Sequence, residues 1–196
     1  MREVSTNKQK VIIIEGLDNV GKDTLISKIC ERYPITTIVH CSKPSSDDPD
    51  EAAKEQNELF MSYANMIRDN DLKYSDCIIF NRYHMGEYIY GCIYRGRSSE
   101  EVLNMIDEVD DVLLASNKDI YYIQMKSSNL DLIIKNDDNK SISKNNRERV
   151  ETERERFEEV FNHSRLNKLL LDVADKDGNF RTREEIFDDV IRFCDL

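Results

Sequence analysis

Apolar residues along the chain alternate between short continuous runs and stripes at helical spacing. The runs are β-branched or rich in leucine and have the length of buried strands: 11–14, 36–40, 77–80, 120–125 and 169–171. The stripes predict helices over these stretches: 22–33, 51–70, 99–115 and a segment after residue 146. Capping boxes at Ser98-x-x-Glu101 and Thr182-x-x-Glu185 mark the start of the third helix and of a last one. Strands that alternate with helices predict a parallel sheet with helices on both faces.

The stretch from Lys135 to Asn146 is the least regular part of the chain. It is rich in Asn, Asp, Ser and Lys and has no apolar periodicity, whereas the helix after it offers Val150, Phe157 and Val160 as candidate buried positions. A polar stretch of this length is either an ordinary surface loop or a functional lid. The motifs described below favour a lid at about residues 135–149.

Composition narrows the class of protein. We expect one domain over residues 1–196, because the chain has domain size and no linker rich in Pro or Gly. The 28 Lys and Arg against 39 Asp and Glu give a net charge of −11, which argues against nucleic acid as a partner. No apolar run has the ~20 residues of a membrane span, and residues 1–5 show no signal-peptide h-region. Five scattered cysteines without C-x-x-C fit a reducing compartment, so we expect a cytoplasmic protein with no membrane contact.

The strongest motif, residues 16–24, follows the first predicted strand and opens the first helix. It contains G-x-x-x-x-G-K in the context that a phosphate-binding loop requires. The glycines let backbone N–H groups turn toward a polyphosphate, the helix dipole adds positive potential, and Lys22 supplies a mobile cation. We therefore predict that ATP is bound by Gly16, Asn19, Val20, Gly21, Lys22, Asp23 and Thr24.

Asp23 departs from the usual loop, in which the residue after the lysine is Ser or Thr and its hydroxyl binds Mg²⁺. A carboxylate can bind Mg²⁺ directly or through water, so Asp23 is the candidate metal ligand. The alternative is that Asp23 only caps the helix start.

Several motifs together resemble the thymidylate kinase family of nucleoside monophosphate kinases. Residues 15–18 match its E-G-x-D opening, and residues 81–83 are similar to its D-R-Y with Asn81 in place of Asp. Tyr90 falls at the family's downstream tyrosine, residues 149–151 are similar to D-R-[IF]-E, and Lys43-Pro44 more weakly to R-E-P. The resemblance covers roughly residues 10–195. It implies a three-layer P-loop fold whose five parallel strands are ordered 2-3-1-4-5, with ATP and Mg²⁺ as cofactors.

The resemblance also implies a reaction, the phosphorylation of a deoxynucleoside monophosphate, with dTMP as the default acceptor. Phosphoryl transfer needs cations around the migrating group. Arg82 takes over the bridging role of the family's arginine, and Lys22 serves the donor phosphates. Because Asn19 and Val20 carry no charge, further catalytic cations should come from the lid, which carries Lys140, Lys144, Arg147 and Arg149. Arg147 and Arg149 are the leading candidates; the alternative is an exposed helix face on which they pair with nearby glutamates.

Acceptor residues follow from the same resemblance. Asp18 would bind the 3′-hydroxyl, Phe60 would stack on the base with Tyr63 as runner-up, and Glu87 and Tyr88 would line the pocket. The full expected acceptor set is Glu15, Asp18, Lys43, Phe60, Tyr63, Arg82, Glu87 and Tyr90. The family's base-reading arginine has no match on the second helix, and its glutamine after the downstream tyrosine is Gly91 here. A different or modified base, above all a pyrimidine, therefore stays open.

Two rival functions remain. A deoxynucleoside kinase would need a general base where the third strand ends, and Asn81 cannot serve as one. A regulatory module that binds nucleotide without turnover is the other. A homodimer is expected by resemblance. Residues 173–184 superficially resemble a calcium loop, but Val173 occupies the first ligand position, so we expect a turn there.

Overall fold

The computed structural model describes residues 8–136, 141–143 and 146–196. Its centre is a five-stranded, all-parallel sheet in the order β2-β3-β1-β4-β5, as predicted. The strands are β1 (Lys10–Gly16), β2 (Thr36–His40), β3 (Cys77–Asn81), β4 (Asp119–Lys126) and β5 (Asn167–Asp172). Every residue of β1 is buried, which explains its continuous apolar run at the centre of the sheet.

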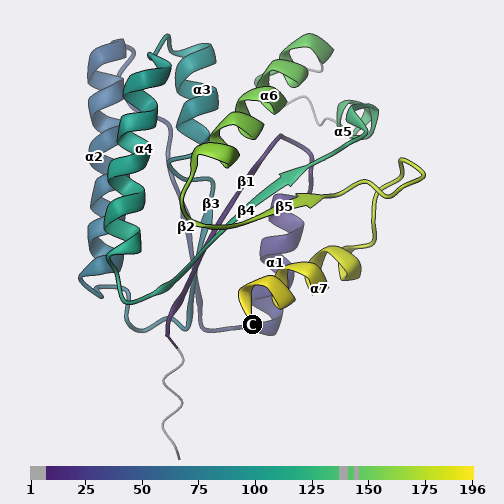
Figure 1. Cartoon of the computed structure of the whole chain (residues 1–196), viewed down its shortest axis with the longest axis horizontal. Helices are drawn as coiled ribbons and strands as arrows, with labels where there is room; N and C mark the ends of the chain where they lie inside the picture. The colour runs from purple at the N-terminus through teal and green to yellow at the C-terminus, as the bar shows by residue number, and fades with distance from the viewer. Residues whose placement is uncertain (1–7, 137–140, 144–145) are drawn as a thin grey trace, which may run out of the picture.

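Helices cover both faces of the sheet (Figure 1). On one side lie α1 (Lys22–Arg32) and α7 (Arg183–Cys194). On the other lie α2 (Pro49–Arg68), α3 (Gly86–Tyr94), α4 (Ser99–Leu114) and α6 (Arg147–His163). The short helix α5 (Leu130–Lys135) follows β4. The three-layer arrangement predicted from the alternating pattern is confirmed.

Two helices were not expected from the pattern. Helix α3 begins five residues after β3 and has buried polar and apolar residues together, among them Glu87 and Ile89. Helix α5 has only six residues, too few for helical periodicity to be recognised. Both predicted capping residues, Ser98 and Thr182, cap α4 and α7, and Glu185 completes the box at α7.

The carboxyl ends of the strands meet at one edge of the sheet, where ligands bind in such folds. Gly16 ends β1 there with φ +138°, and a Cβ atom at this position would lie 2.1 Å from the carbonyl oxygen of Met125 on β4. Only glycine allows this close approach, which brings the phosphate-binding loop against β4. Within the described ranges, no helix combines the length and apolar composition needed to cross a bilayer.

Candidate active site

The loop from Gly16 to Gly21 turns around a cavity of about 550 Å³ at the carboxyl end of β1. Asn19 and Gly21 have positive φ angles of 62° and 86°, which bend the backbone into a cradle. Gly21 is the N-cap of α1 and provides no side-chain cap, so the first N–H groups of the helix stay available for an anion. The cavity is lined by Asp18, Asn19, Gly21, Lys22, Asp23, Thr24, His40, Cys41, Asn81, Arg82, Asn136 and Ser141.

Lys22 is buried and folded back over this loop. Its Nζ donates to the carbonyl oxygens of Gly16 at 3.1 Å and Leu17 at 2.6 Å. Burial, followed by the nearby positive charge of Arg82, lowers the pKa of Lys22 to about 7. A bound polyphosphate would add negative charge beside the ammonium group and favour its charged form.

A second cavity of about 310 Å³ adjoins the first, and the two share Asp18, Cys41 and Arg82. Beyond those residues it is lined by Ser42, Lys43, Gln56, Phe60, Tyr83, Gly86, Glu87, Tyr90, Arg95 and Ile142. The chain thus places a phosphate-binding loop and a separate side-chain pocket in contact at Arg82.

Arg82 lies where the two cavities meet, immediately after β3. Its backbone has φ +65°, a left-handed conformation that a bulky residue rarely adopts and that is enriched at functional sites. Nη1 donates to the Gly16 carbonyl at 3.1 Å and to the Tyr90 hydroxyl at 2.7 Å, and Nη2 pairs with Asp18. The guanidinium group also lies 5.0 Å from the centre of the Tyr90 ring. These contacts hold the fork of Arg82 against the phosphate-binding loop.

Glu15 fixes the turn that carries Arg82. It is fully buried, and its Oε1 accepts hydrogen bonds from the backbone N–H groups of Tyr83 at 2.7 Å and Gly86 at 3.0 Å. Burial raises the pKa of Glu15. Glu15 lines neither cavity, so its geometry indicates support of the turn after β3 rather than contact with a ligand.

The two departures from the resembling family lie side by side. Asn81 Nδ2 donates to Asp23 Oδ1 at 2.6 Å, and both side chains line the cavity of the phosphate-binding loop. The carboxylate gained at position 23 therefore stands next to the position where the carboxylate at 81 is missing.

The expected base-stacking residues differ in their placement. Phe60 lines the second cavity from α2, packs edge to face on Tyr83 at 5.5 Å and is almost fully buried. Tyr63 packs against Phe80 and Tyr83 and does not line the cavity. Tyr88 also lies outside it, and its hydroxyl donates to Glu159 at 2.9 Å.

The lid residues are only partly placed. Lys140 and Lys144 lie outside the described residues. Arg147 begins α6, where it is exposed and hydrogen-bonds Asp131 at 2.6 Å and Glu151 at 3.1 Å. Arg149, next to Glu148 on the same helix, is also exposed. Neither Arg147 nor Arg149 lines the first or the second cavity. The catalytic role of Arg147 and Arg149 stays a prediction.

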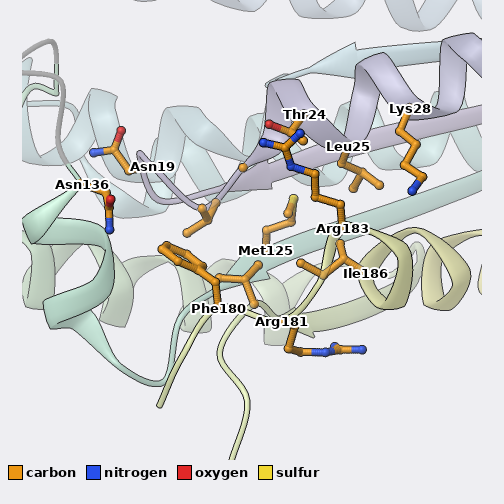
Figure 2. A pocket seen from close by; sticks show the side chains of 13 residues that line it. Asn19, Thr24, Leu25, Lys28, Met125, Asn136, Phe180, Arg181, Arg183 and Ile186 are labelled. Carbon is orange, nitrogen blue, oxygen red and sulfur yellow. The ribbon is translucent and has the colours of Figure 1, made fainter. Parts of the chain in front are cut away.

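A third cavity, of about 370 Å³, also adjoins the phosphate-binding loop (Figure 2) and shares Asn19, Gly21, Thr24 and Asn136 with the first cavity. Phe180 and Arg183, from the connection between β5 and α7 and the start of α7, line it opposite Asn19 and Thr24. Arg181 also lines it, but its side chain points away and donates to Asp189 at 2.6 Å. Phe180 is 41% exposed and lines this cavity. Sequence reasoning missed these residues; the usable signal was that they follow a parallel strand whose carboxyl end lies at the ligand-binding edge.

Glu153 on α6 is a buried carboxylate that borders the same loop. It accepts a hydrogen bond from the Tyr94 hydroxyl at 2.5 Å and lines a small gap with Leu17, Asp18 and Asn19. Burial raises the pKa of Glu153, and the charge of Asp18 adds to this, against the opposing effect of Tyr94. The folded protein therefore keeps this proton to higher pH than the unfolded chain does.

Glu153→Gln should stabilise the protein at neutral and higher pH. The contribution of this carboxyl group to the free energy of unfolding falls as pH rises above the pKa that a glutamate has in the unfolded chain. Glutamine has no such pH dependence, and its amide oxygen can still accept from Tyr94. Thermal melts between about pH 5 and pH 8 should show that the melting temperature of the variant exceeds that of the wild type by a margin that grows with pH. The matched control is Glu158→Gln, an exposed position on the same helix. A gain that is equal at all pH values would contradict the explanation.

Comparison with solved structures places the fold. YorR protein from Bacillus subtilis, solved in complex with phosphorylated GDP, matches with a TM-score of 0.62 at 19% identity, over 95% of this chain and 96% of that one. Thymidylate kinase from Candida albicans gives 0.58 at 14% identity, over 96% and 92%. Deoxyadenosine kinase from M. mycoides gives 0.53 at 16% identity, over 95% and 100%. The chain has the fold of P-loop nucleotide kinases. No model of a protein family and no curated protein matches the sequence.

Proposed function

We propose that the protein transfers the γ-phosphoryl group of ATP to a deoxynucleoside monophosphate and forms the diphosphate. The observation that carries the proposal is the position of Arg82, which lines both the phosphate-loop cavity and the adjoining side-chain pocket. A kinase acting on nucleotides needs this arrangement, because two anionic phosphates must meet around shared cations. The shared fold with a thymidylate kinase and a deoxyadenosine kinase supports the same class of reaction.

Each cavity then has a role. Backbone N–H groups of the loop and Lys22 hold the donor phosphates, and the pocket beside Phe180 receives the donor base. The second cavity receives the acceptor, with Asp18 toward its sugar and Lys43 and Arg82 toward its phosphate. An acceptor phosphate oxygen attacks the γ-phosphorus in line, the bond to the β-phosphate oxygen breaks, and ADP leaves. Arg82 lowers the barrier by offering N–H donors to the charge on the transferring group.

A magnesium ion fits the oxygen groups at positions 23 and 81. The described residues contain no cluster of three or more His, Cys, Asp or Glu that could hold a metal by itself. Mg²⁺ bound with nucleotide phosphates needs only one or two protein carboxylates, and Asp23 beside Asn81 and Thr24 supplies hard oxygen donors at the cavity wall. When bound, the ion neutralises charge on the donor phosphates.

The metal assignment predicts that Asp23→Ser raises the Mg²⁺ concentration needed for half-maximal activity and lowers turnover. The reason is that the carboxylate at 23 stands in for the one that position 81 lacks. The double variant Asp23→Ser/Asn81→Asp should restore both, since it returns the carboxylate to the end of β3. Magnesium titrations of the three proteins measure this. Unchanged magnesium dependence in Asp23→Ser would mean that Asp23 only caps α1.

Purified protein incubated with ATP, Mg²⁺ and a panel of nucleosides and nucleoside monophosphates tests the proposal directly. We expect products from monophosphates only. Transfer to free nucleosides alone would make the protein a nucleoside kinase, although Asn81 already donates its amide to Asp23 and offers no general base. Nucleotide binding without any transfer would indicate a regulatory module.

A further inference from the structure

A cluster of four polar residues adjoins the second cavity, and two of them, Glu87 and Arg95, line it. Glu87 on α3 has a side chain only 2% exposed and pairs with two arginines. Arg95 Nη2 donates to Glu87 Oε2, and Arg97 Nη1 donates to Glu87 Oε1 at 3.0 Å. Arg97 Nη2 also donates to Asn57 Oδ1 at 3.1 Å. We call these residues, Asn57, Glu87, Arg95 and Arg97, the Glu87 cluster.

The position of this cluster depends on Gly91. A Cβ atom at 91 would lie 2.5 Å from Glu87 Oε1 and 3.2 Å from Arg97 Cδ. The carboxylate is the end of a flexible side chain, but two guanidinium groups hold it, so it cannot move away without losing them. The carboxylate thus occupies the room that a side chain at position 91 would otherwise fill.

The cluster lies at the end of the cavity where an acceptor base would sit. Asp18, Cys41 and Arg82 belong to both cavities and so mark the end near the donor phosphates. Glu87 and Arg95 line only the second cavity and lie beyond that boundary. An acceptor whose phosphate meets Arg82 therefore extends its base toward the Glu87 cluster.

Charge and exposure single out Arg95 as the group that faces a ligand. The cluster holds one carboxylate against two guanidinium groups, so it is positive. The Arg97 side chain is 6% exposed, lines no part of the cavity, and its buried Nε has no hydrogen-bond partner among the described residues. Arg95 is 27% exposed and lines the cavity. A guanidinium group only donates, so the atom of the base that meets Arg95 must accept.

Gln56, which also lines the second cavity, adds the opposite hydrogen-bonding preference. Its Nε2 donates to the main-chain carbonyl of Ser42 at 3.1 Å. A carbonyl can only accept, so this contact fixes which end of the amide is nitrogen and leaves the amide oxygen as the acceptor for a ligand. A donor from Arg95 and an acceptor from Gln56 complement a base edge with a keto oxygen beside a ring N–H.

We propose that Arg95, positioned by Glu87, is a specificity-determining residue that selects acceptors with such a lactam edge over acceptors with an amino edge. Uracil, thymine, guanine and hypoxanthine present a keto oxygen next to N–H. Cytosine and adenine present an amino group there, which would set a donor against Arg95. The inference rests on the proposed function, because it assumes that the second cavity holds the acceptor nucleotide.

Binding of matched nucleotides tests this inference separately from catalysis. dUMP and dCMP differ only in the group at C4 and its neighbouring ring nitrogen, and dIMP and dAMP differ in the same way at C6. Calorimetry without ATP should give dissociation constants about tenfold or more lower for the lactam member of each pair that binds. Arg95→Gln should bring that ratio to within about threefold. Arg192→Gln, at an exposed position on α7, should keep the wild-type ratio.

Gly91→Ala provides a second variant that leaves Arg95 itself intact. It should displace Glu87 and lower the ratio without removing any charged group. The inference is overturned if the wild-type protein binds both members of a pair equally, if Arg95→Gln weakens all four nucleotides by the same factor, or if none of them binds. If the protein discriminates between the bases but transfers no phosphoryl group, the proposed function is refuted, whereas the role of Arg95 in base selection is supported.

Discussion

Arg82→Lys should lower kcat for phosphoryl transfer about 100- to 1000-fold, the range seen when one preorganised donor to a transition state is lost. Lysine keeps the positive charge but replaces a planar fork of donors with a single point. Arg82 uses that fork on Gly16, Tyr90 and Asp18 at the boundary of the two cavities. Steady-state kinetics with ATP and the best monophosphate acceptor measure the effect.

The division between kcat and KM makes this result diagnostic. If Arg82 contacts the transferring group, most of the loss falls on kcat, whereas a residue that only binds acceptor would mainly raise KM. Arg165→Lys is the matched control. Arg165 follows α6, pairs with Asp107 and Asp111 of α4, and lines none of the described cavities. A kcat for Arg82→Lys within about threefold of the wild type would remove Arg82 from the mechanism.

The sheet could be predicted because its signals are local. Each strand is a short apolar run, and the glycines and lysine of the loop follow the first of them directly. Asp23 and Asn81 are both visible in the sequence as departures from the resembling family, and their side chains meet. Strand order brings Asn81, at the end of β3, next to the end of β1. The loop after β1 then returns Asp23, the second residue of α1, to the same place.

The polar end of the second cavity could not be predicted in the same way. From the sequence, Gly91 reads as the loss of a recognition residue, yet its lack of a side chain makes room for the Glu87 carboxylate. Arg95 and Arg97 follow α3, a helix that the periodicity did not reveal. Arg147 shows the converse case: its charge suggested catalysis, and the fold pairs it with Asp131 of α5. Contacts between side chains on different elements depend on helix orientation, which apolar spacing does not encode.

Lys22→Met should reduce transfer about 1000-fold while leaving the fold as stable as before or more stable. The ammonium group is buried against the carbonyls of Gly16 and Leu17, and burial lowers its pKa to about 7, so the folded protein gains little from its charge. Methionine of similar length removes a buried ionisable group and fills the same space. Kinetics and thermal melting of the same preparation measure both effects.

The combination of the two measurements separates catalysis from structure. A lost rate with an unchanged or higher melting temperature assigns Lys22 to the donor phosphates, because only the bound polyphosphate makes its charge favourable in this cavity. A large fall in melting temperature would instead indicate that Lys22 mainly stabilises the loop through its hydrogen bonds to Gly16 and Leu17. Lys118→Met is the control, since Lys118 precedes β4 at the opposite edge of the sheet and bonds only Asn70 among the described residues. It should change neither the rate nor the melting temperature.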